Sequence, residues 1–583
     1  MVEEPIQSSR EDAEHRSPGG QRLETSRVET ARVPGPTSAA GRLRWLLAAA
    51  VSIVVVAGSV AIAALVVGGA GPSGLLARAP GDSLLYAELR FDLPGGQRAA
   101  VGRFLSAFPG FDDQALLEAK LDDLFERAVG AATDGRLHWS GGIEAWFGGE
   151  AAVVVRGLSK SIIGGPELPV PLLLATVVDP AAARSWVTAA LDASGVAWTR
   201  DTIAGADAIL VGGAVDARAV AVTDTLLVGG RVDDVRAVLK TTPASSLGAA
   251  DRPKAAAAAL PADHVAWLYV DGAAYRSWLA GLLAGTGTSL STALLSPALV
   301  EIPDWASVEL RFDGDRLVVE AAIPTGGTAA TDAPSRLAGL VPGDAVVFVG
   351  VGGVGPRLTE RARVLQADPA LGPALEPVFA ALDRIGGVEA LVGWIDELGF
   401  TAGVEGDDVW GALLAVPRDR AAAEALAGSL LNLARLGLPG LRVDEETVAG
   451  RTIVSVELPG SAAERADGRI GVAWTIGAAI IVARDATTVR RILGVEPGAS
   501  LADEARYATL LARAGGPAGS SVAFLDLARL RTLVEAKLEP AERARYERDI
   551  RPYLAPFDAA VALTRTDGGI QRTVFFVRAA EVE

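Results

Sequence analysis

Most of the chain after residue 78 alternates short apolar runs with turn residues, a pattern typical of strands joined by tight connections. The runs EAAVVVRGL (150–158) and PLLLATVV (171–178) predict buried strands, and the segment that follows Asp179-Pro180 predicts a helix. Asp313-Gly314 and Asp567-Gly568 each separate two apolar runs, which is the strongest short signal for a β-hairpin. We therefore predict an α+β fold with a mainly antiparallel sheet and packed helices.

Apolar residues recur with a clear period in two further regions, one with the spacing of strands and one with the spacing of a helix. The runs at 203–213 and 219–230 alternate as paired strands do. Asp113 is a candidate helix N-cap, and the apolar stripe that follows it at helical spacing is expected to face the sheet. The residues of this stripe are Leu116, Leu117, Leu121, Leu124, Phe125 and Ala128.

One segment is apolar enough to cross a membrane. From Leu46 to Val67 the sequence carries no charge over 22 residues, and at about 1.5 Å per residue this length spans the roughly 30 Å hydrocarbon core. Arg42 and Arg44 precede the segment, whereas the other flank has no charge before Arg78. The positive-inside rule then predicts a cytoplasmic N-terminus and an extracytoplasmic C-terminal part.

The N-terminal region divides into three parts on the same grounds. Residues 1–43 are rich in Ser, Pro, Gly, Arg and Glu and lack an apolar period, which predicts a disordered cytoplasmic tail. We predict an uncleaved transmembrane signal anchor over residues 44–69, because the leader is too long for a cleaved signal peptide. Residues 70–78 are the predicted linker. The prediction is therefore a single-pass protein of the cell membrane.

Short motifs repeat in the same order along the extracytoplasmic part. Ala-Pro-Gly-Asp at 79–82 introduces one apolar run and Val-Pro-Gly-Asp at 341–344 introduces another. Later pairs are GGIEA with GGVEA, Thr202–Gly205 with Thr447–Gly450, and the two Asp-Gly hairpin signals. A collinear series is far less likely by chance than isolated matches, and repeats of this kind decide the architecture. We predict two tandem homologous domains, over residues 79–335 and 336–583.

The anchor, the two Pro-Gly-Asp openings and the duplicated order of strands and helices resemble a bacterial envelope family catalogued as domain of unknown function 3352. The resemblance covers the predicted ectodomain and also fits the total length and the single N-terminal helix. Its motifs are patterns of small and apolar residues. That family implies a membrane-anchored envelope protein and supplies no activity, cofactor or catalytic residue.

Composition narrows the classes of function. The chain has 71 acidic and 54 basic residues, a formal net charge of −17, and this charge opposes binding to nucleic acid or to an anionic lipid surface. It has no cysteine, which excludes disulfides, thiolate nucleophiles and zinc-thiolate sites. We predict no nucleic-acid partner.

The glycines of Gly350–Gly355 fit the pattern G-x-G-x-x-G after a predicted strand. In a dinucleotide-binding fold such glycines bring a pyrophosphate to a helix N-terminus. The matching place in the first copy reads ELRFDLPGG, and no parallel βαβ pattern surrounds the motif. We therefore interpret it as a glycine-rich turn and predict no cofactor.

Candidates for catalysis or metal binding are few. The three histidines, His15, His138 and His264, have no second histidine at ligand spacing, so we expect surface or partly packed residues and no metal. No G-x-S-x-G motif of serine hydrolases is present. The adjacent carboxylates are expected to be solvated helix caps; they are Asp112-Asp113, Asp122-Asp123, Asp233-Asp234 and Asp407-Asp408.

The eleven tryptophans, from Trp45 to Trp474, are dispersed among apolar periods and are predicted to be core residues instead of a binding groove. With no chemical constellation in view, the catalytic residues stay unknown. The sequence favours a non-catalytic binding or scaffold module that contacts an envelope protein or peptide. An extracytoplasmic hydrolase using two distant carboxylates, and a sensor coupled to the cytoplasmic tail, remain open alternatives.

Overall fold

The computed structural model describes residues 74–111, 122–123, 126–127, 130, 138–157, 170–212, 217–278, 302–325, 332–368, 372–384, 386–406, 408–438, 441–457 and 471–580, all within one compact unit. The predicted tail (1–43), the predicted anchor (44–69) and most of the helix predicted from Asp113 lie outside these residues. Within the described ranges, no helix combines the length and the apolar character needed to cross a membrane.

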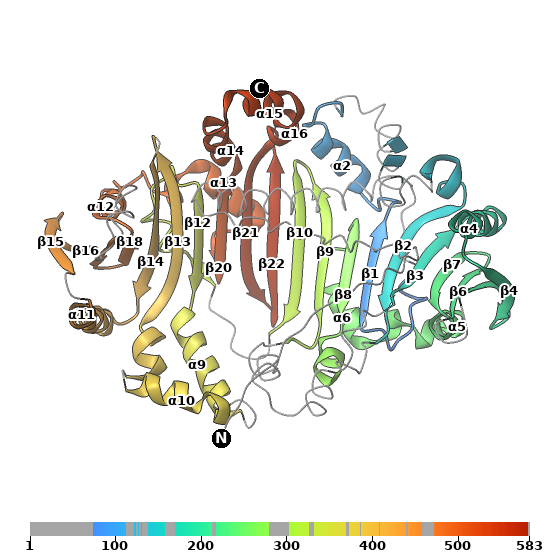
Figure 1. Ribbon diagram of the computed structural model, residues 1–583, viewed down its shortest axis with the longest axis horizontal. Coiled ribbons are helices and arrows are strands. Elements are labelled where there is room, and N and C mark those ends of the chain that lie inside the picture. Colours follow the sequence, from blue (N-terminus) through green and yellow to red (C-terminus); the bar gives the residue numbers. More distant parts are fainter. Residues whose placement is uncertain are drawn as a thin grey trace, which may run out of the picture. The chain divides into compact units, whose positions relative to one another are not determined.

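Twenty strands of the described chain form one antiparallel sheet (Figure 1). We call residues 74–325 half 1 and residues 332–580 half 2. The strands of half 1 are β1 (Leu85–Arg90), β2 (Phe147–Val155), β3 (Leu172–Val177), β4 (Trp198–Ile203), β5 (Ala206–Val211), β6 (Arg218–Val222), β7 (Leu226–Arg231), β8 (Ala266–Val270), β9 (Ala306–Asp313) and β10 (Arg316–Pro324). The strands of half 2 are β12 (Val347–Gly352), β13 (Ile395–Glu405), β14 (Asp408–Pro417), β15 (Arg442–Val448), β16 (Arg451–Glu457), β17 (Gly471–Ile476), β18 (Ile480–Ala483), β20 (Ser521–Asp526), β21 (Phe557–Asp567) and β22 (Ile570–Ala579).

The two halves have the same strand order. Half 1 runs β4-β5-β6-β7-β3-β2-β1-β8-β9-β10 from the outer edge to the centre. Half 2 runs β15-β16-β17-β18-β14-β13-β12-β20-β21-β22. The last strands of the halves, β10 and β22, pair antiparallel in the middle and join both into one sheet. The predicted α+β class and antiparallel sheet are confirmed.

Local features recur at matching places. Pro80 bridges Ser246 in half 1, and Pro342 bridges Ser500 in half 2. The β4–β5 and β15–β16 hairpins turn through Ala204 (φ 50°) and Ala449 (φ 49°), each followed by a glycine of positive φ. Both predicted Asp-Gly hairpins form, between β9 and β10 and between β21 and β22.

Helices connect the strands and cover the sheet. In half 1 they include α2 (Gln97–Leu105), α4 (Pro180–Ser194), α5 (Val232–Lys240) and α6 (Asp251–Ala258). In half 2 they include α9 (Val354–Ala367), α10 (Gly372–Asp383), α11 (Arg420–Gly437), α12 (Ala486–Leu493), α13 (Ala505–Ala514), α14 (Leu527–Ala536), α15 (Pro540–Asp549) and α16 (Arg551–Leu554). The helix predicted after Asp179-Pro180 is α4, where the Asp179 carboxylate accepts hydrogen bonds from two first-turn backbone N–H groups.

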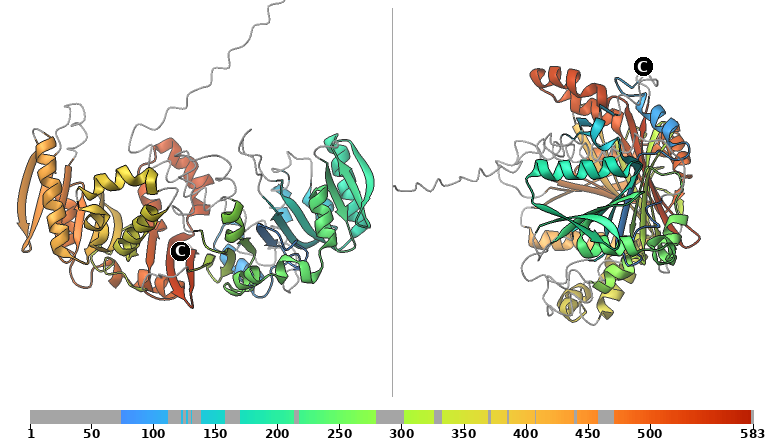
Figure 2. Two further views of the ribbon diagram at one scale, coloured as in Figure 1. Left: turned by 90° about the horizontal axis from the view of Figure 1, so that it is seen from below. Right: turned by 90° about the vertical axis from the view of Figure 1, so that its right-hand side faces the viewer.

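The two faces of the sheet differ in what covers them. On the face that we call the core face, Val228 of β7 and Leu174 of β3 pack with Val235 of α5, and half 2 repeats this packing with α12. Successive strand residues point to opposite faces, so Leu173 and Leu227 lie on the other face, called the open face here. Helix α4 lies over the open face beside β6 (Figure 2), at the position that α11 takes beside β17 in half 2.

Candidate functional site

The open face of half 1 is hollowed into a groove of about 770 Å³. Helix α4 forms one wall with Trp186, Val187 and Leu191. Small residues make the floor and leave the space unfilled; they are Ala87, Ala151, Ala175, Gly229 and Ala266. The volume is within the range of about 300–1,000 Å³ that is usual for ligand sites.

The groove is apolar and partly open to solvent. Leu173 and Val153, which are direct cross-strand neighbours, expose 51% and 37% of their surface. The rings of Trp146 and Trp186 contact each other at 5.2 Å between centroids. Because soluble proteins seldom expose contiguous large apolar side chains, this face is a candidate binding surface.

The same place in half 2 is also apolar. Phe400 and Leu413 are cross-strand neighbours on the open face and expose 42% and 53% of their surface. Counted from the strand order, they correspond to Val153 and Leu173. Helix α11 adds exposed leucines, among them Leu433. Apolar exposure on the open face is therefore common to both halves.

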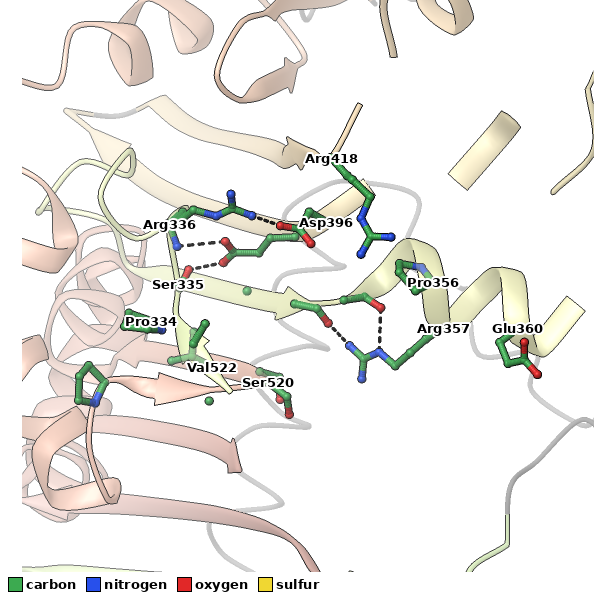
Figure 3. Close-up of a pocket in the computed structure, with 18 residues that line it drawn as sticks. Pro334, Ser335, Arg336, Pro356, Arg357, Glu360, Asp396, Arg418, Ser520 and Val522 are labelled. Carbon is green, nitrogen blue, oxygen red and sulfur yellow. Dashed lines mark hydrogen bonds and ion pairs between the residues drawn. The ribbon is translucent and has the colours of Figure 1, made fainter. Parts of the chain in front are cut away.

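A second hollow, of about 630 Å³, lies in half 2 and has several charged side chains in its lining (Figure 3). Glu397 of β13 is its most buried carboxylate, with 6% of the residue exposed. One carboxylate oxygen accepts a hydrogen bond from the Ser335 hydroxyl, and the other accepts one from the Arg336 backbone N–H at 3.0 Å. We call this hollow the half-2 pocket.

The glycine motif borders this pocket. Gly350 and Gly352 end β12, and Gly353 (φ 64°) precedes α9. A side chain at Gly355 would place its Cβ 2.5 Å from the Ile395 carbonyl oxygen, so glycine is required where α9 approaches β13. Both neighbours of β12 run antiparallel to it, which is not the geometry of a dinucleotide-binding βαβ unit.

Arginines surround the mouth of the half-2 pocket. Arg336 forms an ion pair with Asp396, and Arg357 donates hydrogen bonds to the carbonyl oxygens of Gly352 and Gly353. Burial lowers the pKa of Arg357. The guanidinium of Arg418 points into the pocket in Figure 3 and has no hydrogen-bond or ion-pair partner within the described residues.

Half 1 has buried charges where half 2 has the pocket. The Arg90 guanidinium donates to the Asp92 carboxylate at 2.7 and 2.5 Å and lies 3.5 Å from Glu150. Glu88 accepts hydrogen bonds from the Tyr86 hydroxyl at 2.5 Å and contacts His264 Nε2 at 2.8 Å. Burial raises the pKa of Glu150, and Arg90 opposes that rise.

A second group of buried charges lies farther along the same face. Arg311 donates to Glu309 at 2.7 Å and to Glu320 at 2.9 Å. The second carboxylate oxygen of Glu309 has no hydrogen-bond partner in the described structure, and burial raises the pKa of this carboxyl to about 7. The matching residues of half 2, Leu563 and Val574, are apolar cross-strand neighbours.

The residues considered from the sequence are dispersed. His138 is exposed and contacts Glu126, whereas His264 is half-buried beside Glu88. Asp233 and Asp234 lie in the first turn of α5, as predicted, but Asp234 also forms an ion pair with Arg156. Asp408 begins strand β14, so the helix cap predicted there is wrong. Asp112, Asp113 and Asp407 lie outside the described residues. Across the described ranges, no group of three potential metal ligands occurs.

Five tryptophans, Trp139, Trp146, Trp267, Trp305 and Trp410, are buried, as predicted for core residues. Trp146 and Trp267 also line the groove of half 1 together with the partly buried Trp186, so the prediction that tryptophans form no groove is wrong for these residues. Trp45 lies outside the described residues. Sequence reasoning missed Glu397 and the arginines around it. A signal was present, because aligning the two Pro-Gly-Asp openings places Gly350 and Gly352 opposite Glu88 and Arg90.

Comparisons with known proteins add little. No known family model and no curated protein matches the sequence. Among solved structures, the chain is similar to one described as "Structure of crystal form I of TP0453", with 9% identity, a TM-score of 0.22 and coverage of 52% of this chain and 87% of that chain. With so low a TM-score, this likeness carries no inference about fold or function.

Proposed function

We propose that the chain is a membrane-anchored envelope protein whose folded part is a non-catalytic binding module, and that the groove of half 1 holds a hydrocarbon chain. The observation that carries the proposal is the apolar groove of about 770 Å³ beneath α4. Transfer of apolar surface from water contributes roughly 25 cal/mol per Å², so an apolar ligand has a direct driving force to enter.

The chemistry of the groove favours a hydrocarbon over an extended peptide. A peptide carries an N–H and a C=O group at nearly every residue, and each requires a partner when it leaves water. The floor of the groove is the face of strands β1, β2, β3 and β8, whose backbone groups are already paired within the sheet. A hydrocarbon chain leaves no polar group without a partner.

We also propose that the two halves are homologous domains, as the series of motifs predicts. The common strand order, the matching Pro80 and Pro342 bridges and the matching Ala204 and Ala449 turns support this proposal. The signal anchor at 44–69 with a cytoplasmic N-terminus, and membership of the envelope family, belong to the same proposal and rest on the sequence.

A hydrolase has less support. Asp396 and Glu397 are the adjacent carboxylates of the half-2 pocket, but Asp396 is ion-paired with Arg336 and Glu397 is hydrogen-bonded by Ser335. These partners favour a binding role over acid–base chemistry for the pair. The sensor alternative depends on the tail, which lies outside the described residues.

The test is photo-crosslinking in membranes that contain the full-length protein, with a diazirine-bearing fatty acid as the probe and mapping of the labelled peptides. We expect labelling of β2, β3 and α4. Labelling of residues 46–67, the predicted membrane segment, is the internal reference.

Two variants obstruct the groove in different ways. Ala87→Phe fills its floor, and Leu173→Gln makes its rim polar at a half-exposed position where folding is little affected. Both should reduce labelling of half 1 by about tenfold, which corresponds to about 1.4 kcal/mol. Leu413→Gln, at the matching place in half 2, is the matched control and should leave the labelling of half 1 unchanged.

Unchanged labelling of half 1 in both groove variants would show that the probe does not occupy the groove, and the proposal would be wrong. A second outcome would also overturn it. If the variants instead abolish crosslinking of half 1 to a co-purifying polypeptide and leave its labelling by the fatty acid unchanged, the groove binds a protein.

A further inference from the structure

The half-2 pocket lies where half 1 holds the Arg90 side chain. In half 1, Arg90 of β1 is the direct cross-strand neighbour of Glu150 of β2. In half 2, Gly352 of β12 is the direct cross-strand neighbour of Glu397 of β13. The carboxylates match further, because Glu150 accepts a hydrogen bond from the backbone N–H of Gly74 and Glu397 accepts one from that of Arg336, both at 3.0 Å.

Three side chains of half 1 are absent from half 2 at this place. Glu88, Arg90 and His264 correspond to Gly350, Gly352 and Gly519, as the register of β1 with β8 and of β12 with β20 indicates. All three glycines line the half-2 pocket. The hollow is therefore the space that an ionic cluster fills in half 1.

Glu397 keeps the buried carboxylate but lacks the cation. In half 1 the guanidinium of Arg90 lies 3.5 Å from the Glu150 carboxylate. Within the described residues, the hydrogen bonds of Glu397 come from a hydroxyl and a backbone N–H, and no guanidinium contacts it. An ionised carboxylate has about four acceptor positions, and a buried charge is costly without a partner of opposite charge.

The lining as a whole is balanced in charge. Three arginines and three carboxylates border the pocket, namely Arg336, Arg357, Arg418, Glu360, Asp396 and Glu397. Glu397 lies inside, whereas Arg418 is exposed at the mouth with its guanidinium directed into the pocket. A ligand with charge of one sign only would leave one of these two groups uncompensated.

We propose that the half-2 pocket binds a small zwitterion, with a guanidinium or primary ammonium group against Glu397 and a carboxylate or phosphate against Arg418. The Arg90 guanidinium of half 1 lies beside Glu150 in the way that the cationic end of this ligand would lie beside Glu397. The inference concerns half 2 and is independent of the hydrocarbon proposed for half 1, so either can fail alone.

The test is calorimetric titration of the full-length protein in detergent micelles with L-arginine, which carries both charged groups, and with agmatine, which lacks the carboxylate. We expect both to bind and L-arginine to bind at least about tenfold more tightly, because only its carboxylate can accept charge-assisted hydrogen bonds from Arg418. Arg418→Ala should remove most of this difference and leave agmatine binding within about twofold. Arg435→Ala, an exposed arginine of α11, is its matched control.

Gly352→Arg restores the half-1 residue at the matching place. A Cβ at Gly352 has its nearest contact 3.7 Å away, at the Ser520 carbonyl oxygen, so the substitution fits the backbone. The new guanidinium should form an ion pair with the Glu397 carboxylate and thereby abolish the binding of both probes. Gly428→Arg, on the exposed side of α11 with open space around it, is the matched control and should bind as the wild type does.

Glu397→Gln provides a second route to the same question and should weaken both probes by at least about tenfold. Three results would overturn the proposal. The first is that the wild type binds neither probe at about 10 mM, a concentration near the weak limit of such contacts. The second is that Gly352→Arg binds the probes as tightly as the wild type does. The third is that Arg418→Ala weakens the binding of both probes equally.

Discussion

Half 1 and half 2 have the same strand order and differ in what occupies the space beside the end of their first strand. Half 1 fills it with Glu88, Arg90 and His264, whereas half 2 has glycines there and a pocket of about 630 Å³. The backbone register around the two carboxylates, Glu150 and Glu397, is the same. One scaffold therefore supports either a buried ionic cluster or a cavity, and a few side chains decide which.

The largest expected effect comes from breaking the cluster in half 1. Arg90→Met removes the buried guanidinium that donates to Asp92 and lies 3.5 Å from Glu150. Loss of one partner of a buried ion pair typically costs about 3–5 kcal/mol of the free energy of unfolding. Urea unfolding of the full-length protein, followed by tryptophan fluorescence, measures this loss.

The control for that variant lies in half 2. Arg336→Met breaks the ion pair with Asp396, but the Arg336 side chain is 58% exposed, so the expected loss is below about 1 kcal/mol. Equal losses in the two variants would contradict the contrast between a buried and an exposed charge site.

A smaller effect on the free energy of unfolding depends on pH and comes from Glu309 of half 1. Burial raises the pKa of Glu309 to about 7, whereas an unfolded glutamate titrates near about 4.3. Between these values the folded state binds the proton more tightly, so this group's contribution to stability is present at low pH and is lost as the pH rises to 7. The loss amounts to about 2–3 kcal/mol.

Glu309→Gln should remove that dependence. We expect the free energy of unfolding of the wild type to fall relative to that of the variant between pH 4.5 and pH 7, and urea midpoints measured across this range give the difference. A constant difference would mean that Glu309 titrates alike in both states.

The smallest effect tests what the halves have in common. Ala204 and Ala449 occupy the left-handed region in matching turns, at φ 50° and 49°. Replacing either alanine by glycine removes a backbone strain of about 1–2 kcal/mol from the folded state. Part of this gain is offset because glycine loses more conformational entropy on folding than alanine does. Thermal unfolding should show a gain of about 0.5–1 kcal/mol for each variant. Opposite signs would argue against equivalent turns.

The sequence predicted the elements well because their signals are local. The Asp-Gly hairpins, the helix capped by Asp179 and the strand runs depend on residues a few positions apart. The joining of the two predicted domains through β10 and β22 has no local signal, because those strands are 246 or more residues apart along the chain (570 − 324 = 246). The pairing of the two halves into one sheet could therefore be seen only in the structure.

The candidate sites were harder to predict. Alternation along β1 places Glu88 and Arg90 on one face, but only the packing shows that this face is the buried one. The glycine motif was interpreted as a turn, and its place beside a pocket could be seen only from the cross-strand position of Glu397. A groove floored by small residues has no sequence signature, because Ala87, Ala151, Ala175 and Ala266 come from four separate strands and meet only through strand pairing.

The central pairing of β10 with β22 also determines which strand edges face water. Within the part of the chain that the structure describes, the sheet ends at β4 and β15, whose sequences, WTRDTI and RVDEETV, carry charges that discourage a further strand from adding. The inner strands are apolar, with VV in β10 and VFFV in β22, and each covers the edge of the other. A half separated from its companion would expose such an edge along 9 or 10 residues and would self-associate through it, so the pairing that unites the halves also protects the protein from aggregation.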